Sequence, residues 1–438
     1  MVTKRIVTLL TVAMFLGVFA ASTVFASGSS ESTGPTNLTM WTGYSERLPV
    51  YNAAIADYTA EHPNVKIEIS SFDLRQSEQK LQIALAAGTA PDISGLGFQL
   101  MQRLAAENYF EPLPAADVSW INQNYDKVYV DAVTRDGKIY AIPEVQGQQL
   151  LFYNIDNYNA AGISGPPSTL DGLMSDAQKL TKYDANGKVT HSGISFRLTG
   201  GGSGVAEKWE IFLFANGGRI LEPTGPHTWK AGFDNEAGYN AVNFYLTALY
   251  KTKVDSFDVK HDEDAFVNGI TSQFNRETYI IGSMRSKAPN TQYGISQVVG
   301  GPGGRATNLN IDTFVVPASG KSKAVAWDFA KYLEQDKYAV MMMDKVGWTV
   351  SKKGVDYSSV YAKEPHFKQA LDRPAGFKLF PSAAAVSWGE AYTGLANGLV
   401  SAFSDPSMLD NKAKIMAFLD AQAKAVNDVL KSNNEYAQ

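Results

Sequence analysis

The fold is decided by residues 136–182, which read DGKIYAIPEVQGQQLLFYNIDNYNAAGISGPPSTLDGLMSDAQKLTK. Asp136-Gly137 is a hairpin turn pair, and the alternation over residues 138–142 predicts a half-buried strand. Pro143 should end this strand, because proline has no backbone N–H to donate. Residues 150–154 are apolar and too few for a helix, so they predict a second, buried strand.

A helix should follow this second strand. Pro166-Pro167 break the chain, and Ser168 or Thr169 can cap a first helical turn. The next apolar residues recur at helical spacing, at Leu170, Leu173, Ala177 and Leu180. From the residues alone, the stretch is a strand, a polar crossing rich in glutamine, a second strand and a helix.

The same stretch closely resembles the crossover of extracellular solute-binding proteins of ABC importers, above all the sugar-binding group that includes maltose-binding protein. That family has a GK-x-YA-x-P run, then YN at the end of a strand, then GI/L…PP-x-T ahead of a helix. The matching residues here are Gly137-Lys138, Tyr140-Ala141, Pro143, Tyr153-Asn154, Gly162-Ile163 and Pro166-Pro167-Ser168-Thr169.

Upstream of this stretch, the chain alternates strands and helices. Strands are expected at 38–41, 65–69 and 90–94, with helices at about 48–62 and 77–87. This order predicts a parallel, doubly wound α/β sheet. In such sheets ligands bind beyond the carboxyl ends of the strands. Three loops hold that position: Trp41–Arg47, Phe72–Gln76 and Gly95–Gln99.

The resemblance implies an α/β, two-lobed periplasmic binding protein fold with multiple hinge crossovers. We expect residues 37–144 and 309–353 to form the first α/β lobe. Residues 145–308 and 354–438 should form the second lobe, which ends in an Ala-rich helix at about 413–431. A ligand that contacts both lobes would favour the closed form.

Composition is that of a soluble globular protein. Of 438 residues, 45% are hydrophobic and 19% are charged, which is ordinary for a folded chain. The net charge of −5 leaves no basic surface for nucleic acid. There is no cysteine, so we expect no disulfide, no thiolate metal site and no lipid anchor.

The N-terminus has the pattern of a secretory signal. Lys4 and Arg5 precede an uncharged run, and Val24-Phe25-Ala26 offers a cleavage site. We therefore expect a cleaved signal peptide over residues 1–26, a flexible leader over 27–36 and a periplasmic protein. An uncleaved membrane anchor is the alternative, because the run is almost long enough to span.

The first candidate ligand contacts lie in the strand-end loops. In sugar sites aromatic faces stack on pyranose rings, and planar polar groups match the hydroxyls. The candidates are Trp41, Tyr44, Glu46, Arg47, Phe98 and Gln99. The alternatives are a core position for Trp41 and a solvated helix start for the two charged residues.

The polar crossing supplies the second group, Gln146 and Gln148. Maltose-binding protein has a carboxylate in this segment, and the matching position here is Gly147. This departure indicates that Gln146 or Gln148 makes the hydrogen bonds, and it argues against maltose itself. A solvated hinge is the alternative interpretation.

The third group comes from the second half of the chain, at positions that the resemblance places near the ligand. Its members are Arg197, Lys208, Trp209, Arg276, Glu277, Trp348 and Trp388. A buried structural pair of Arg276 with Glu277 is the alternative for those two, and a core position is the alternative for Trp348.

Other motifs do not predict a cofactor or metal. The loop Gly200–Gly204 lacks the Gly-Lys-Ser/Thr of a phosphate loop. The five histidines are scattered, and residues 261–264 are better explained as an acidic helix start. Asp184-x-Asn186-Gly187 lacks the remaining ligands of a calcium loop, so we expect a turn.

The resemblance implies a monomeric binding protein that captures a mono- or oligosaccharide between its lobes and delivers it to an ABC permease. No cofactor, metal or nucleic acid is expected. The alternative from another class is a secreted glycosidase or lyase, which needs two carboxylates across one bond. A metal- or polyamine-binding member of the same fold ranks third, because the strand-end loops are mixed in charge.

Overall fold

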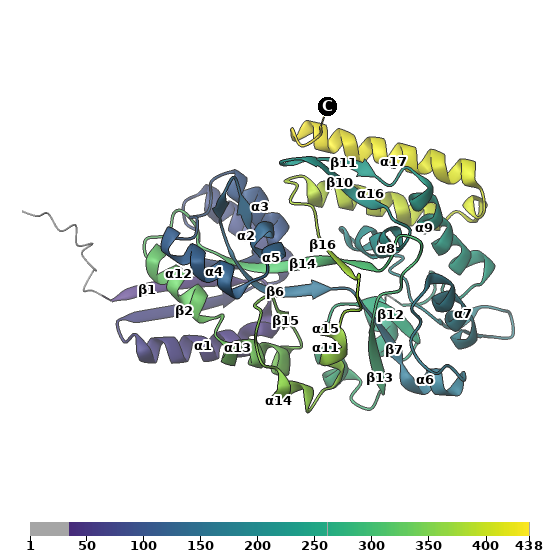
Figure 1. The fold of residues 1–438 in the computed structure, drawn as a ribbon, viewed down its shortest axis with the longest axis horizontal. Coiled ribbons are helices and arrows are strands. Elements are labelled where there is room, and N and C mark those ends of the chain that lie inside the picture. Colours follow the sequence, from purple (N-terminus) through teal and green to yellow (C-terminus); the bar gives the residue numbers. More distant parts are fainter. Residues whose placement is uncertain (1–34, 261, 438) are drawn as a thin grey trace, which may run out of the picture. The chain divides into compact units, whose positions relative to one another are not determined.

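The computed structural model describes residues 35–260 and 262–437, and its largest feature is a mixed sheet of seven strands (Figure 1). The order is β15–β6–β14–β3–β1–β2, and β16 also pairs with β14. The strands are β1 (Thr36–Thr42), β2 (Val65–Ser71), β3 (Ile93–Gly97), β6 (Ile142–Gln148), β14 (Ala306–Val315), β15 (Thr349–Val350) and β16 (Lys378–Pro381).

The predicted signal peptide and residues 27–34 of the predicted leader lie outside the described residues. Within the described ranges, no helix is both long enough and apolar enough to cross a membrane.

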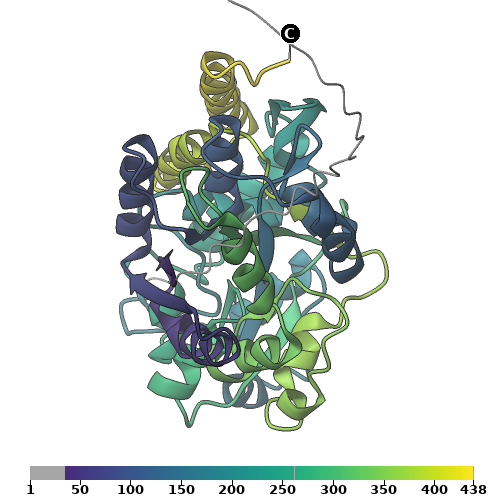
Figure 2. The same ribbon diagram turned by 90° about the vertical axis from the view of Figure 1, so that its left-hand side faces the viewer.

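The predicted parallel order is confirmed for β2, β1 and β3, which are linked by α1 (Leu48–Glu61) and α2 (Leu74–Ala86). Figure 2 shows α1 beside β2. The helix α2 begins three residues before the predicted start, because the Asp73 side chain caps it by accepting a hydrogen bond from the Arg75 N–H. The strand β3 also lies three residues later than predicted. Beyond β3 the sheet turns antiparallel at β14.

The prediction that Pro143 ends a strand is wrong, because β6 starts at Ile142 and runs through Pro143 to Gln148. Pro143 pairs only with Thr313 of β14, at a register shift, and β15 reaches β6 only at Val145 and Gln146. The missing N–H therefore falls where the ladder is irregular and one side of β6 is unpaired. The polar crossing of the sequence is a strand.

A smaller antiparallel sheet follows, in the order β12 (Gln273–Arg276), β7 (Leu150–Asn154) and β13 (Tyr293–Gln297). The strand β7 has the predicted bounds. The predicted helix is α7 (Leu170–Leu180), and the Thr169 hydroxyl caps it by accepting from the Gly172 N–H at 3.1 Å. The short helix α6 (Ile155–Ala160) was not predicted.

Three hairpins and the other helices surround the two sheets. The hairpins are β4 (Thr134–Arg135) with β5 (Lys138–Ile139), β8 (Lys182–Tyr183) with β9 (Val189–His191), and β10 (Arg219–Gly225) with β11 (Thr228–Gly232). The other helices are η1 (Ser45–Arg47), α3 (Phe98–Ala106), η2 (Ala115–Asp117), α4 (Val118–Asn124), α5 (Lys127–Ala132), α8 (Gly204–Ala215), α9 (Glu236–Leu246), η3 (Thr247–Lys251), α10 (Asp262–Val267), α11 (Ile280–Lys287), α12 (Lys323–Tyr332), α13 (Asp336–Met341), η4 (Met342–Val346), α14 (Ser358–Tyr361), α15 (His366–Leu371), α16 (Trp388–Phe403), η5 (Pro406–Met408) and α17 (Lys412–Ser432).

The described residues bury two large hydrophobic clusters. One surrounds the large sheet and includes Met40 and Phe314. The other surrounds α8, α9, α16 and α17 and includes Trp209 and Leu419. The predicted lobe boundaries fall inside β6 and β14, and Phe152 of the small sheet belongs to the first cluster. The boundaries therefore remain a prediction.

Candidate functional site

A cavity of about 670 Å³ lies at the carboxyl ends of β1, β2 and β3. All three predicted loops contribute to its lining, with Tyr44 from the first, Leu74 and Arg75 from the second, and Gly97 and Gln99 from the third. The side chains converge because parallel strands end at the same edge of a sheet. This edge is therefore the position of the candidate site.

Most of the remaining lining residues are distant in sequence from these three loops. Between β9 and β12 these are Arg197, Gly201, Ser203, Gly204, Glu207 and Lys208, and after them Arg276, Glu277, Tyr279 and Trp348. Other lining residues are Glu78, Gln82, Leu100, Arg103, Gly147, Asn310, Ile311, Asp312, residues 385–390 and Asn433.

A buried ion pair network supports the floor of the cavity. Arg47 is fully buried, donates to Glu144 at 2.9 Å and donates to Asp312. Tyr44 donates to the other oxygen of Asp312 at 2.6 Å, and Tyr51 donates to Glu144 at 2.6 Å. Arg47 does not line the cavity, so its effect is to hold Asp312 and Tyr44 in place.

Trp348 forms an aromatic wall of the cavity. The Arg47 guanidinium lies 5.0 Å from its ring centroid, and the Tyr279 ring lies 5.4 Å away at 32°. Gly147 of β6 makes room for this wall, because a Cβ at that position would lie 3.3 Å from both Glu277 Cγ and Trp348 Cζ3. The space that a side chain at position 147 would need is therefore occupied by the side chains of Glu277 and Trp348.

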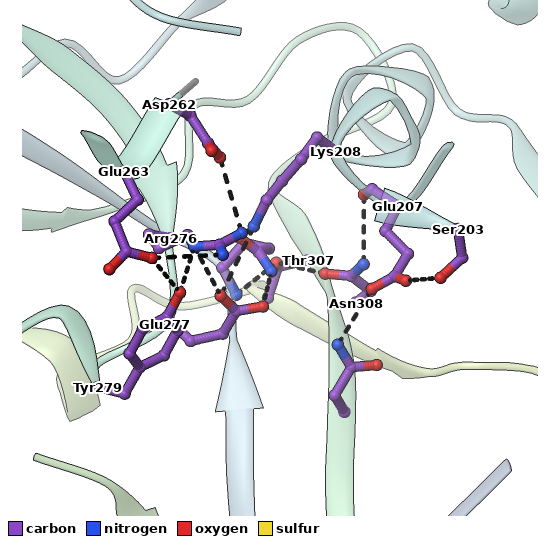
Figure 3. A network of polar contacts seen from close by, with 12 residues as sticks. Ser203, Glu207, Lys208, Asp262, Glu263, Arg276, Glu277, Tyr279, Thr307 and Asn308 are labelled. Carbon is purple, nitrogen blue, oxygen red and sulfur yellow. Dashed lines mark hydrogen bonds and ion pairs between the residues drawn. The ribbon is translucent and has the colours of Figure 1, made fainter. Parts of the chain in front are cut away.

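Figure 3 shows the polar network at the end of β12. Glu277 accepts a hydrogen bond from Gln149 and lies 3.6 Å from Lys208 and 3.8 Å from Arg276. Burial opposes ionisation of Glu277, but Lys208 and Arg276 outweigh it and keep the pKa of Glu277 below its usual value. Glu277 is thus a fixed negative charge.

Arg276 of this network also contacts Tyr279, whose hydroxyl accepts from its Nε at 2.7 Å. Its other partners are Asp262 and Glu263, each 3.6 Å away at the start of α10. The predicted acidic helix start is confirmed, and its carboxylates neutralise Arg276.

Trp388 forms a second aromatic wall, at the start of α16. Its ring stacks on Tyr392 with centroids 4.5 Å apart at 26°. The Tyr392 hydroxyl donates at 3.0 Å to Glu210, a carboxyl group that is buried behind it. Burial raises the pKa of Glu210 to about 7.

Replacing Glu210 with glutamine should make stability less dependent on pH. A raised folded-state pKa means that Glu210 favours folding below pH 4.5 and loses this contribution as the pH rises through about 7. From these pKa values, the stability of the variant relative to wild type should rise by about 2.5 kcal/mol from pH 5 to pH 8. Urea unfolding at both pH values measures this difference, and a constant difference would contradict the prediction.

Seven of the predicted contacts line the cavity: Tyr44, Gln99, Arg197, Arg276, Glu277, Trp348 and Trp388. Lys208 also lines it. Whether each one touches a ligand remains a prediction.

Two predicted contacts are buried elsewhere, so the structure corrects these assignments. Trp209 is fully buried in the second cluster, where its ring packs edge-on against Phe233. Phe98 is fully buried in the first cluster. Both are core residues, because the inner faces of α8 and α3 pack there.

Gln146 and Gln148 face away from the cavity, which is a second correction. Side chains alternate along a strand, so the lining position of Gly147 turns both neighbours to the other face of β6. The Gln146 amide donates to the Val350 carbonyl at 3.1 Å, and the Gln148 amide donates to the Ala370 carbonyl at 2.9 Å. They are structural.

Three residues of the first loop also lie outside the lining, which is a third correction. Trp41 points to the face of β1 opposite Met40 and packs edge-on against Phe72. The Glu46 side chain is 47% exposed and lies 3.6 Å from Arg47. Arg47 belongs to the buried network below the floor.

Sequence reasoning missed Asn310 and Asp312, which line the cavity from β14. Their signal was available, because polar Asn308, Asn310 and Asp312 alternate with Leu309 and Ile311. The helical residues Glu78, Arg103 and Glu207 had no such signal.

The remaining motifs have structural explanations. Gly204 begins α8, and Asp184 accepts from the N–H groups of Asn186 and Lys188, as expected for a turn. Among the residues that the structure describes, no group of three His, Asp or Glu could hold a metal ion.

A polar cavity with aromatic walls, at the carboxyl edge of an α/β sheet, is typical of a site that binds a small solute. The family comparison agrees: the model of the bacterial extracellular solute-binding proteins matches residues 43–340, and the chain belongs to this family. Such proteins are the substrate-binding components of ABC transporters, so fold and family are those of transport proteins.

Individual relatives are distant. A Brucella abortus protein named as a binding protein is 22% identical over 84% of this chain and 87% of its own. The lactose-binding protein of Rhizobium radiobacter is 28% identical over 35% of this chain and 38% of its own. An ABC substrate-binding protein of Listeria monocytogenes, solved with cycloalternan, has a TM-score of 0.74 at 17% identity and covers 91% of this chain and 99% of its own.

Proposed function

We propose that this protein captures a sugar or oligosaccharide and delivers it to the permease of an ABC importer. The observation that carries the proposal is the pair of aromatic walls, Trp348 with Tyr279 and Trp388 with Tyr392, around a cavity lined by planar polar groups. Aromatic faces hide the apolar C–H faces of pyranoses, and amides, carboxylates and guanidinium groups match their hydroxyls. The lactose-binding relative supports the same ligand class.

We propose the following further properties because the chain belongs to the solute-binding family. The protein acts as a monomer in the periplasm after its signal peptide is removed, without a lipid anchor. Residues 37–144 with 309–353 and residues 145–308 with 354–438 form its two lobes, which close around the ligand at the hinge crossovers. A ligand can drive closure only by its higher affinity for the closed form. Nucleic acid is not a partner.

We propose a binding protein in preference to a carbohydrate-active enzyme. A glycosidase needs a carboxylic acid whose pKa is raised so that it can protonate the leaving group. Glu277, which Lys208 and Arg276 hold ionised, has its pKa shifted in the opposite direction. Asp312 is already engaged by Arg47 and Tyr44.

Tryptophan fluorescence tests the proposal directly, because Trp348 and Trp388 line the cavity. The protein should first be unfolded and refolded to remove carried-over ligand, then titrated with mono-, di- and oligosaccharides. A saturable change at micromolar or tighter Kd, with the sugar recovered intact, is expected. No response to any sugar would refute sugar capture, and consumption of the sugar would identify an enzyme.

Replacing Trp388 with alanine should weaken sugar binding without unfolding the protein. The loss of one stacking face corresponds to roughly a tenfold rise in Kd. The fold should persist because Trp388 is only partly buried, with its ring at the edge of the second cluster. Calorimetric titration gives the affinity and circular dichroism checks the fold; an unchanged Kd would remove Trp388 from the site.

A further inference from the structure

Arg197 is a cation of the cavity without a counter-ion. Among the described residues, no side chain forms a hydrogen bond or an ion pair with it, and its Nε is buried without a partner. Its position is fixed by Gly204, the first residue of α8. A Cβ there would lie 2.5 Å from the Arg197 Cζ and 2.6 Å from its Nε, so the guanidinium packs directly on the backbone.

Among the described residues, none of the carboxylates that line the cavity pairs with Arg197. Glu78 pairs with Arg75 at 2.7 Å, and Glu277 pairs with Lys208 and Arg276. Glu207 accepts from two neutral donors, Ser203 (Figure 3) and Asn310, the latter at 3.3 Å. Asp312 accepts from Arg47 and Tyr44. Glu390 lines the cavity but is exposed to solvent.

Arg103 is a second arginine of the cavity that has no ion pair among the described residues. It lines the cavity from α3, its guanidinium donates to the Gln82 amide oxygen, and its Nε is buried without a partner. Among the described residues it forms no ion pair with a carboxylate. Two arginines of the cavity, Arg197 and Arg103, therefore form no ion pair within the described part of the chain.

We propose that the ligand carries an oxyanion, a uronate carboxylate or a phosphate ester on a sugar, and that Arg197 binds this group. The proposal rests on the sugar-binding function proposed above. A guanidinium presents a planar fork of donors that matches a carboxylate or phosphate with two parallel hydrogen bonds. A neutral sugar would satisfy donors but leave the positive charge uncompensated in a partly buried site.

Lys208 gives the proposal a pH dependence that can be measured. Burial lowers the pKa of Lys208 to about 8, and the Arg276 and Arg197 charges add to this lowering, whereas Glu277 and Asp262 oppose it. An anion bound at Arg197 adds a negative charge near Lys208, so it should raise this pKa and cause proton uptake near pH 8. The affinity for the anion should then fall as the pH rises above 8.

Matched ligands test the proposal. The panel contains glucuronate, galacturonate and mannuronate with their disaccharides, the methyl ester of each acid, the neutral parent sugars and the corresponding 6-phosphates. Refolded wild-type protein should bind one acid or phosphate roughly 10- to 100-fold more tightly than the neutral partner. Tighter binding of the uronate or of the phosphate identifies which oxyanion is used.

Variants assign the preference to Arg197. Arg197→Gln keeps hydrogen-bond donors and removes the charge, so it should abolish the difference between acid and ester. Lys127→Gln also removes one positive charge, but from a side chain that is 86% exposed on α5, and it should leave the preference unchanged. Calorimetry of wild type at pH 8 in buffers of different ionisation enthalpy should show proton uptake with the acid and none with the ester.

The outcomes separate this proposal from the function on which it rests. If the tightest ligand of the panel is neutral, or if Arg197→Gln retains the preference for the acid, the anion proposal is overturned and sugar capture stands. If no member of the panel binds, both proposals fail.

Discussion

Replacing Arg47 with alanine is expected to lower the free energy of unfolding by about 3 to 5 kcal/mol, because one buried partner of an ion pair would be left alone. Arg47 is fully buried, and Glu144, which lies 2.9 Å from it, has a side chain only 4% exposed. Burial already raises the pKa of Glu144 to about 6 against the opposing charge of Arg47. Without that charge the pKa should rise further, so the loss of stability should be greater at pH 8 than at pH 5.

Denaturant unfolding at both pH values measures this loss, and Arg75→Ala is the matched control. Arg75 also pairs with a glutamate, at 2.7 Å, but its side chain is 70% exposed. Exposed pairs contribute about 0 to 1 kcal/mol. A double variant, Arg47→Ala with Glu144→Gln, should regain part of the lost stability because no buried charge remains at Glu144. Equal losses for Arg47→Ala and Arg75→Ala would show that the buried network does not stabilise the fold.

Replacing Trp348 with alanine is expected to reduce sugar affinity by about 2 to 3 kcal/mol, or roughly 30- to 150-fold in Kd. The change removes the stacking face and also leaves the cavity wall incomplete. Tyr279 and Arg47 pack against the Trp348 ring, so both side chains would lose this contact. Calorimetric titration with the best ligand of the fluorescence panel measures the change.

Trp120→Ala is the control for this prediction. Trp120 is a partly buried tryptophan on α4 that packs edge-on against Tyr125 and does not line the cavity. Its removal should cost some stability and leave Kd unchanged. Trp348→Phe should retain most of the affinity, because a smaller aromatic face remains. Equal Kd values for the two alanine variants would exclude Trp348 as a stacking surface.

Local signals predicted the parts of the fold that local interactions form. The bounds of β7 follow from five apolar residues between polar segments, and α7 follows from the Thr169 cap and its apolar spacing. The order of strands and helices also placed the site, because the carboxyl ends of β1, β2 and β3 share one edge. Seven of the fourteen predicted contacts line the cavity, but only Tyr44 and Gln99 lie in these strand-end loops, and the other five were expected from the family resemblance.

The other seven predicted contacts do not line the cavity, because the direction in which a side chain points depends on residues that are distant in sequence. Gln146 and Gln148 are polar residues in a strand, and only the pairing of β6 with β14 shows that Gly147 is the one that faces the cavity. Trp209 is as aromatic as Trp388, but it lies on the face of α8 that packs against Phe233.

By itself, the sequence determined the class of fold, the family and the edge of the sheet where the site lies. The fold class and the edge depend on local periodicity, turn chemistry and strand order, and the family was indicated by the resemblance of the motifs in residues 137–169; all of these signals lie in consecutive residues. Only the tertiary structure decided that Arg47 is a buried support, that Asn310 and Asp312 reach the cavity and that Arg197 has no described counter-ion. Burial and charge pairing depend on residues that lie more than 200 positions apart in cases such as Arg47 and Asp312, and no local pattern encodes them.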